Sequence, residues 1–209
     1  MDDVRTATPS PHQLRALAHP VRLRMLGMLR IDGPATATAL ATRLGLNTGA
    51  TSYHLRQLAS HGFIEDDDSQ GNRRERWWKA SHASTRTASP APDDDEGWQE
   101  TDAYLQTVAT VYTEWLQRAM EERPLLPPQW RDVGTLSDWH PRLTPATATR
   151  LFDQLDHLLS SVVDEDDPEA RHVVFQVSGY VRPGQVAQDG VPGDVGGDAT
   201  EGASGDESP

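Results

Sequence analysis

The chain of 209 residues contains no cysteine and only one lysine, Lys79. Without thiols it can form no disulfide, no thiolate metal site and no iron–sulfur cluster, and it has no cysteine nucleophile. No apolar run approaches the length of about 18 residues that a membrane span needs. The opening segment, MDDVRTATPSPH, lacks the apolar centre of a signal peptide. We therefore expect a cytoplasmic protein.

The common catalytic signatures are also missing. The sequence contains no GxSxG, no glycine loop that could cradle a phosphate, no Rossmann fingerprint and no HExxH. No reaction therefore has a candidate site. We expect a protein that is not an enzyme and that carries no cofactor or metal.

Charge divides the chain into two parts. The formal net charge is -13, but residues 1–80 hold 11 basic and 8 acidic side chains, whereas residues 81–209 hold 8 basic and 24 acidic ones. A mildly basic module is thus followed by a strongly acidic one. Only the first module has a charge that suits a nucleic-acid partner.

Residues 11–62 show the start and stop signals of four short helices. Ser10 precedes Pro11 and can cap the first helix, Thr36 can cap the third, and Asn47 can cap the fourth. Gly45, between the third and fourth helices, suits a left-handed helix end. We expect helices near residues 11–18, 21–31, 36–44 and 47–61.

Two short runs follow that favour β-strands. Residues 63–66 and 74–79 are separated by a polar, glycine-containing stretch, which predicts a β-hairpin. Strand alternation separates Trp77 from Trp78, so one of the two should pack inward. The order of helices, glycine turn and hairpin predicts a mainly α fold with a small β wing, a winged helix-turn-helix.

Composition and periodicity assign the remaining segments. We expect the following division: 1–10 a disordered N-terminus, 11–80 the winged helix-turn-helix, 81–97 a linker, 98–182 a helical dimerisation and possible effector region with a late strand at 173–181, and 183–209 a disordered acidic tail. The linker and the tail follow from their Ser, Thr, Pro, Gly and Asp content.

The predicted fourth helix presents a polar face to DNA. If Thr51, Leu55 and Leu58 face the core, the opposite face is short, polar and able to form hydrogen bonds. Arg56 could bind a guanine edge, and arginines of the hairpin could bind phosphates or a minor groove. The candidate DNA-binding residues are Asn47, Thr48, Gly49, Ser52, Tyr53, Arg56, Arg22, Arg24, Arg73, Arg74 and Arg76.

A second helical pattern begins near Trp98 and alternates steps of three and four residues. This spacing is typical of helices that pair along a seam, so we expect a homodimer, with contacts added by the first helix. The candidate interface residues are Trp98, Leu105, Val108, Tyr112, Trp115 and Ala119.

Other clusters permit a functional interpretation and a plainer one. His54 and His61 could hold a metal but lack a third ligand nearby, so surface histidines are favoured. The acidic residues Asp153, Asp156 and His157 with 164–167 are better explained as a solvated face than as a cation site. Trp130 and Trp139, in an irregular proline-containing segment, remain candidates for a small-molecule pocket.

The run RALAHPVRLRMLGMLRIDGPATATALATRLGLNTGATSYHLRQLASHGFIEDDDSQGNRRERWWKA resembles the ArsR-type (ArsR/SmtB-like) family of bacterial winged-helix regulators. Its LAHPVRLRML opening, ATSYHLRQL helix and hairpin arginines match that pattern over about a third of the chain. The resemblance implies a dimer that places its fourth helix in the major groove of operator DNA and its wing on the flanking backbone or minor groove. It also implies that an effector lowers DNA affinity.

The sequence departs from the metal-sensing members of that family. Its third helix, ATATALATRL, has no cysteine pair, and residues 98–123 contain no histidine or cysteine. The resemblance therefore points to a non-metal subgroup with a helical C-terminal extension and an unknown, non-thiolate effector. The alternative is a winged helix that binds another protein rather than DNA.

Overall fold

The computed structural model describes residues 6–69 and 75–184. Arg73, Arg74 and all but the first residues of the expected acidic tail lie outside this description. Contacts divide the chain into two units, Met1–Val173 and Val174–Pro209, which are described separately. The first unit contains every helix and strand of the described residues.

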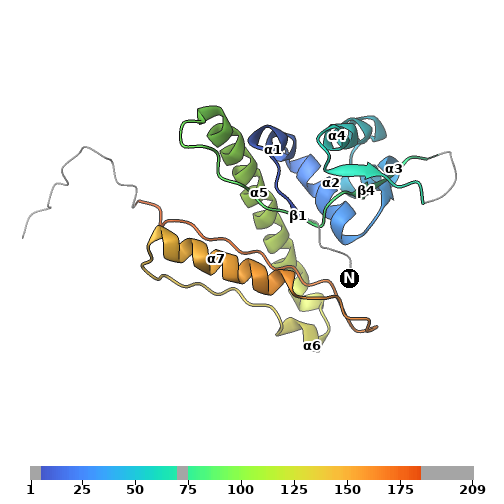
Figure 1. The fold of residues 1–209 in the computed structure, drawn as a ribbon. Coiled ribbons are helices and arrows are strands. Elements are labelled where there is room, and N and C mark those ends of the chain that lie inside the picture. The colour runs from blue at the N-terminus through green and yellow to red at the C-terminus, as the bar shows by residue number, and fades with distance from the viewer. Residues whose placement is uncertain (1–5, 70–74, 185–209) are drawn as a thin grey trace, which may run out of the picture. The chain divides into compact units, whose positions relative to one another are not determined.

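Four helices form the N-terminal half of the first unit, close to the predicted positions (Figure 1). They are α1 (Pro11–Leu17), α2 (Pro20–Ile31), α3 (Ala37–Leu44) and α4 (Thr48–Ser60). The predicted caps at Ser10, Thr36 and Asn47 are all present, because each side chain accepts a hydrogen bond from a backbone N–H in the first turn. Helix boundaries are therefore largely a local property of this sequence.

A three-stranded antiparallel sheet completes this half. Its order is β2 (Ala35–Thr36), β4 (Trp77–Ala80) and β3 (Ile64–Asp66). The hairpin pairs Ile64 with Ala80 and Asp66 with Trp78. The fold class, mainly helical with a small sheet as a wing, is confirmed. Strand β2 was not predicted, because it has only two residues and the second, Thr36, is also the cap of α3. Two residues are too few to show an alternation of polar and apolar side chains.

The N-terminal residues are more ordered than expected. Strand β1 (Thr6–Ala7) pairs in parallel with β5 (Ser84–Thr85), and the hydroxyls of Thr6 and Ser84 lie 2.8 Å apart. Residues 6–10 are therefore not disordered, which corrects the expectation for 1–10. Both strands are two residues long, so neither has a pattern that sequence can reveal.

The expected linker at 81–97 is held to the helices. Arg30 of α2 donates hydrogen bonds to the carbonyl of His82 and to the hydroxyl of Thr85, both at 2.9 Å. Burial lowers the pKa of the Arg30 guanidinium. Because two donors of a largely buried cation are satisfied by this segment, the segment is a structural part of the first unit.

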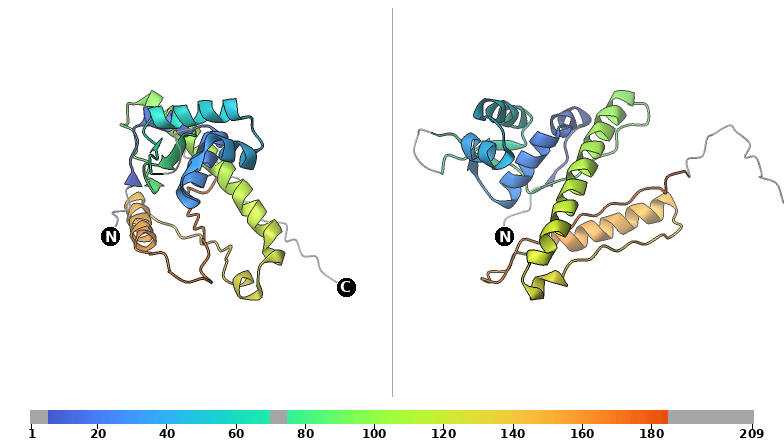
Figure 2. Two further views of the ribbon diagram at one scale, coloured as in Figure 1. Left: turned by 90° about the vertical axis from the view of Figure 1, so that its right-hand side faces the viewer. Right: turned by 180° about the vertical axis from the view of Figure 1, so that it is seen from behind.

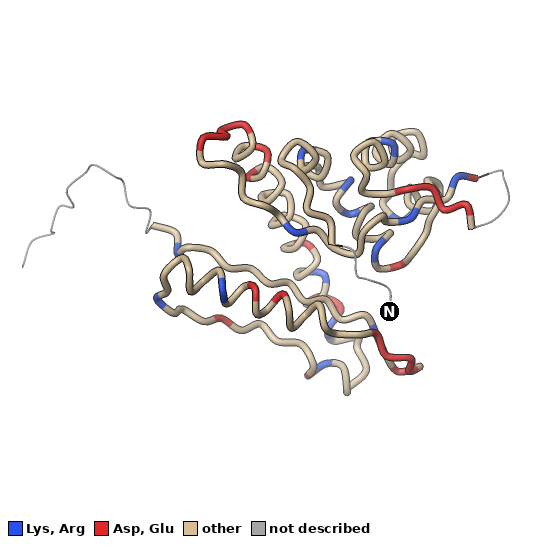
Figure 3. The backbone as a smooth tube through the Cα atoms, in the orientation of Figure 1, with Lys and Arg blue, Asp and Glu red and all other residues tan. Residues whose placement is uncertain are grey.

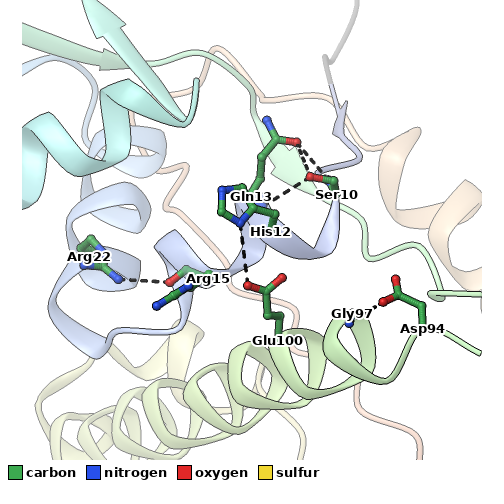
Figure 4. Close-up of polar contacts among 8 residues, drawn as sticks. All are labelled: Ser10, His12, Gln13, Arg15, Arg22, Asp94, Gly97 and Glu100. Atoms are coloured by element: carbon green, nitrogen blue, oxygen red, sulfur yellow. Dashed lines mark hydrogen bonds and ion pairs between the residues drawn. The ribbon is translucent and has the colours of Figure 1, made fainter.

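Helix α5 (Asp95–Glu122) is the long helix and begins three residues before the expected Trp98. Asp94 caps it by accepting from the N–H of Gly97 at 2.9 Å. Helix α5 packs on α1 and α2 (Figure 2). Figure 4 shows one link, in which His12 of α1 lies 3.9 Å from the carboxylate of Glu100.

Three further helical elements follow α5. They are η1 (Arg123–Leu125), α6 (Pro128–Arg131) and α7 (Pro145–Ser160). Thr144 caps α7 by accepting a hydrogen bond from the N–H of Thr147. The guanidinium of Arg86 lies 2.7 Å from Asp156 and 3.7 Å from Asp153 of α7. This contact gives the two carboxylates a partner within the chain.

The prediction of a late strand at 173–181 is wrong. This segment has no assigned helix or strand and pairs with no strand of the described residues. Alternation indicated a strand, yet a strand needs a neighbour to satisfy its backbone groups. Among the described residues, none of the sheets offers that neighbour.

The hydrophobic core lies among α1, α2, α3, α4, the sheet and the first half of α5. Its fully buried members include Leu14, Leu26, Leu40, Leu55 and Leu58. Tyr104 of α5 joins the same core, and burial raises the pKa of its phenol to about 12. Helix α5 is thus an integral part of the domain that carries α4.

Candidate nucleic-acid interface

Helix α4 is positioned by a turn and a cap. Gly45 adopts the left-handed conformation with φ of 65°, as predicted, and Asn47 Oδ1 accepts from the N–H of Ala50 at 2.8 Å. Thr51, Leu55 and Leu58 are fully buried. The inward stripe of α4 is therefore the one that its periodicity predicts, and its orientation follows from it.

The opposite face of α4 is open to solvent. Gly49 and Arg56 are exposed, and Tyr53 is 53% exposed. Arg56 Nε donates to the carbonyl of Ser52 at 3.1 Å, so its side chain runs back towards the helix N-terminus. A Cβ at Gly49 would lie 3.3 Å from the capping Asn47 Oδ1, which favours the absence of a side chain there.

Helix α4 and the wing share one surface groove. It has a volume of about 420 Å³ and is lined by Thr36, Ala37, Thr38, Ser52, Arg56, Glu75, Arg76 and Trp78. The structure thus brings together Ser52, Arg56 and Arg76, which the sequence placed on two separate elements. Sequence reasoning missed the contribution of Thr38, although it follows the Thr36 cap on the outer side of α3.

The wing arginine Arg76 has two partners within the chain. Its guanidinium forms an ion pair and hydrogen bonds with Asp66 and lies 4.1 Å from the ring centre of Trp78. Hydrogen bonding from Arg76 lowers the pKa of the Asp66 carboxyl. Trp78 is the tryptophan that packs inward, as one of the pair was expected to do. Figure 3 shows acidic residues gathered at the end of β3.

Arg22 and Arg24 also have internal partners. Arg22 donates to the carbonyls of Ala16 and Arg15 at the end of α1, and Arg24 pairs with Glu114 of α5. The contact between Arg22 and the carbonyl of Arg15 can be followed in Figure 4. A contact with DNA would require each arginine to leave its partner. Their role on DNA stays a prediction.

His54 of α4 faces a second histidine, His19, which caps α2. The rings of His54 and His19 are 4.7 Å apart, and His54 Nδ1 is buried without a hydrogen-bond partner. Burial is the main cause that lowers the pKa of both imidazoles, helped by the charge of Arg22. In residues 6–69 and 75–184 there is no group of three or more metal-ligating side chains.

Helix α5 places the candidate interface residues in two environments. Val108 packs against the core, and the Trp115 ring would lie 3.1 Å from a Cβ at Gly27 of α2. Tyr112 stacks on Trp115, with ring centres 6.4 Å apart. Trp98 and Leu105 are 40% and 46% exposed, and Ala119 is also exposed. Part of the predicted seam therefore packs against other residues of the same chain, and the rest is exposed.

Four exposed apolar residues of α5, two of which belong to that seam, form a stripe along the helix. We call this set the α5 stripe: Trp98, Leu105, Leu116 and Met120. Trp139, a candidate for a ligand pocket, is 81% exposed. Within the described ranges, none of the helices is long and apolar enough to cross a membrane.

Comparisons with known proteins agree with this architecture over part of the chain. Residues 17–67 match the family model described as "Helix-turn-helix domain". A search of curated protein sequences finds no significant match.

Three solved structures align with about two thirds of the chain. They are the transcriptional regulator Tm0710 from Thermotoga maritima (12% identity, 68% of this chain and 73% of that chain, TM-score 0.28), RV1404 from Mycobacterium tuberculosis (16%, 68% and 82%, 0.29) and disulfide-formed AbfR (14%, 69% and 71%, 0.26). We draw no inference from them, because all three TM-scores are low.

The family match covers α2, β2, α3, α4 and β3, which are the elements that build the exposed polar face and two of the three strands of the small sheet. The sequence match and the three-dimensional arrangement thus concern the same residues. Residues 17–67 form a helix-turn-helix domain, and the sheet that follows α4 makes it a winged one.

Proposed function

We propose that this chain is a dimeric, sequence-specific DNA-binding transcriptional regulator of the ArsR type. One observation carries the proposal. Ser52 and Arg56 on the outer face of α4 line the same groove as Arg76 of the wing. A helix face with a guanidinium and small polar groups, beside a second basic element, suits a DNA groove and its flanking backbone.

The N-terminal half of α4 enters the major groove in this proposal. Thr48 and Gly49 are small and exposed, so the backbone can approach the DNA closely, and the free N–H groups of the first turn favour a phosphate. Arg56 would bind a guanine edge through two hydrogen bonds. Among the ion pairs of the described residues none involves Arg56, so its guanidinium is not held by an internal carboxylate, although Glu75 lines the same groove.

The wing would hold the backbone rather than read bases. Arg76 projects from a short hairpin, where it can contact a phosphate once it leaves Asp66. Asn47, Tyr53, Arg73 and Arg74 remain further candidates for the same surface. A phosphate contact of this kind contributes affinity that falls with salt and carries no sequence information.

A dimer would present two copies of α4 to DNA. The α5 stripe is apolar and exposed, and a two-fold axis through it would pair two α5 helices. Two α4 helices can then read half-sites about 34 Å apart. An effector of non-thiolate chemistry would lower DNA affinity, which makes repression the proposed mode of regulation.

The test begins with genomic fragments that the full chain retains, which are sequenced to define an operator. Arg56→Ala should then weaken operator binding by about 1–3 kcal/mol and binding to a scrambled duplex much less. Fluorescence anisotropy at several salt concentrations measures both. The control is Arg150→Ala, which removes an exposed arginine from α7.

Two outcomes would contradict the proposal. Equal losses on operator and scrambled DNA would remove the base-reading role of Arg56. Failure to enrich any fragment would favour the alternative, a winged helix that binds another protein.

A further inference from the structure

A second cleft lies where α5 passes α2 and α3, away from the outer face of α4. It has a volume of about 380 Å³ and is lined by Arg24, Arg43, Leu44, Glu114, Gln117, Arg118 and Glu121. The close passage of α5 beside α2 can be followed in Figure 2. The volume is within the range of small-molecule sites.

Most of the charges in this cleft already have partners. Glu114 pairs with Arg24 of α2, and Arg43 of α3 lies 2.7 Å from Asp32 outside the cleft lining. Arg118 and Glu121 take part in none of the ion pairs of residues 6–69 and 75–184. One guanidinium and one carboxylate, three residues apart on α5, are therefore left to face the cleft.

We infer that this cleft binds a small zwitterion of the α-amino acid class. Arg118 can hold the ligand carboxylate through two charge-assisted hydrogen bonds, and Glu121 can accept from its ammonium group. Gln117 comes directly before Arg118 and one turn before Glu121 on α5, and it offers an amide to either ligand group. Leu44 supplies the apolar contact for a side chain.

The position of the cleft connects it to DNA binding, and this step rests on the proposed function. Its lining joins α5, the proposed dimer helix, to α3, which leads through the Gly45 turn into α4. A ligand that contacts both helices stabilises those relative positions of α5 and α3 in which both sets of contacts can form. An amino acid would therefore shift operator affinity by its differential affinity for those arrangements.

The experiment titrates the full chain, without DNA, with each common L-amino acid and with acetate and methylammonium, by isothermal calorimetry. We expect at least one amino acid to bind more tightly than either fragment ion. Arg118→Gln and Glu121→Gln should each weaken that binding about tenfold or more. The controls are Arg150→Gln on α7 and Glu122→Gln, the neighbour of Glu121 that does not line the cleft.

Three results would overturn the inference. These are no binding of any amino acid, acetate binding as tightly as the best amino acid, and full binding by both cleft variants. Operator affinity in the absence of ligand is measured separately by anisotropy. If the wild-type chain does not bind the operator, the proposed function is contradicted. If it binds the operator but binds no amino acid, only the amino acid site is contradicted.

Discussion

His54 illustrates how a single side chain on α4 can have a role other than base reading. Its ring contacts His19, the N-cap of α2, and lies near the cation Arg22 and the ring of Tyr53. Adding a proton there places positive charge in a site that is partly desolvated and already near a guanidinium. Burial first, and then the charges of His19 and Arg22, lower its pKa.

This residue should make stability depend on pH. Because the folded-state pKa of His54 is below the unfolded value of about 6.5, the unfolded state binds the proton first as pH falls. Stability is fully present above about pH 6.5 and declines as pH falls from there through the folded-state pKa. His54→Gln should reduce this decline, measured as the urea midpoint at about pH 7.5 and about pH 5.5.

The control for that measurement is His157→Gln, which removes an exposed histidine of α7. An identical pH dependence in wild type and His54→Gln would show that the contact between His54 and His19 does not couple to protonation. His19 itself is a poor test, since its ring accepts from the N–H of Val21 and its loss would remove a helix cap.

At the scale of elements, the wing combines basic and acidic side chains. Asp66 and Lys79 belong to the paired strands β3 and β4, and Arg76 pairs with Asp66 just before β4 begins. Lys79 pairs with Glu65 at 3.3 Å. Both wing cations of the described residues are therefore partly neutralised within the chain. The wing cannot contact a phosphate at full strength unless those pairs open.

Asp66→Asn should consequently increase the affinity for random duplex DNA. The change frees Arg76, and one added phosphate contact should steepen the dependence of log affinity on log salt by about 0.9. Asp68→Asn is the matched control, because it removes the same charge two residues further along the chain and Asp68 is in none of the described ion pairs. Equal gains in both variants would mean that net charge, rather than release of Arg76, causes the effect.

At the scale of the whole molecule, the distribution of buried residues is uneven. No described side chain after Val111 is buried, although many large apolar side chains follow it. Leu116 and Met120 on α5 and Leu151 and Phe152 on α7 are all exposed. An apolar surface of this kind indicates an interaction surface, and a second copy of the chain is the partner that we propose.

Charged substitutions in the α5 stripe should therefore dissociate the proposed dimer. Leu105→Glu places a carboxylate where Leu105 would meet its counterpart across a two-fold axis, and light scattering should show the mass of a monomer. Gln106→Glu is the control, with the same charge one residue further along an exposed part of α5. Wild-type protein that is already monomeric at micromolar concentration would contradict the proposal itself.

The sequence by itself predicted the features that depend on near neighbours. Ser10, Thr36 and Asn47 mark helix starts because a cap binds the N–H groups two or three residues ahead. Gly45 marks the turn because it adopts a positive φ without strain. The buried stripe of α4 follows from a rotation of about 100° per residue. The polar outer face of the fourth helix was predictable for the same reason.

Only the tertiary structure decided the features that depend on distant residues. The pairing of β1 with β5 joins segments 78 residues apart, and Arg24 meets Glu114 across 90 residues. Val108 and Trp115 of α5 pack against other residues of the same chain. The indole of Trp115 has room to do so because Gly27 on α2 carries no side chain. Periodicity identifies an apolar face but not the surface that covers it, because that surface is set by the packing of all elements together.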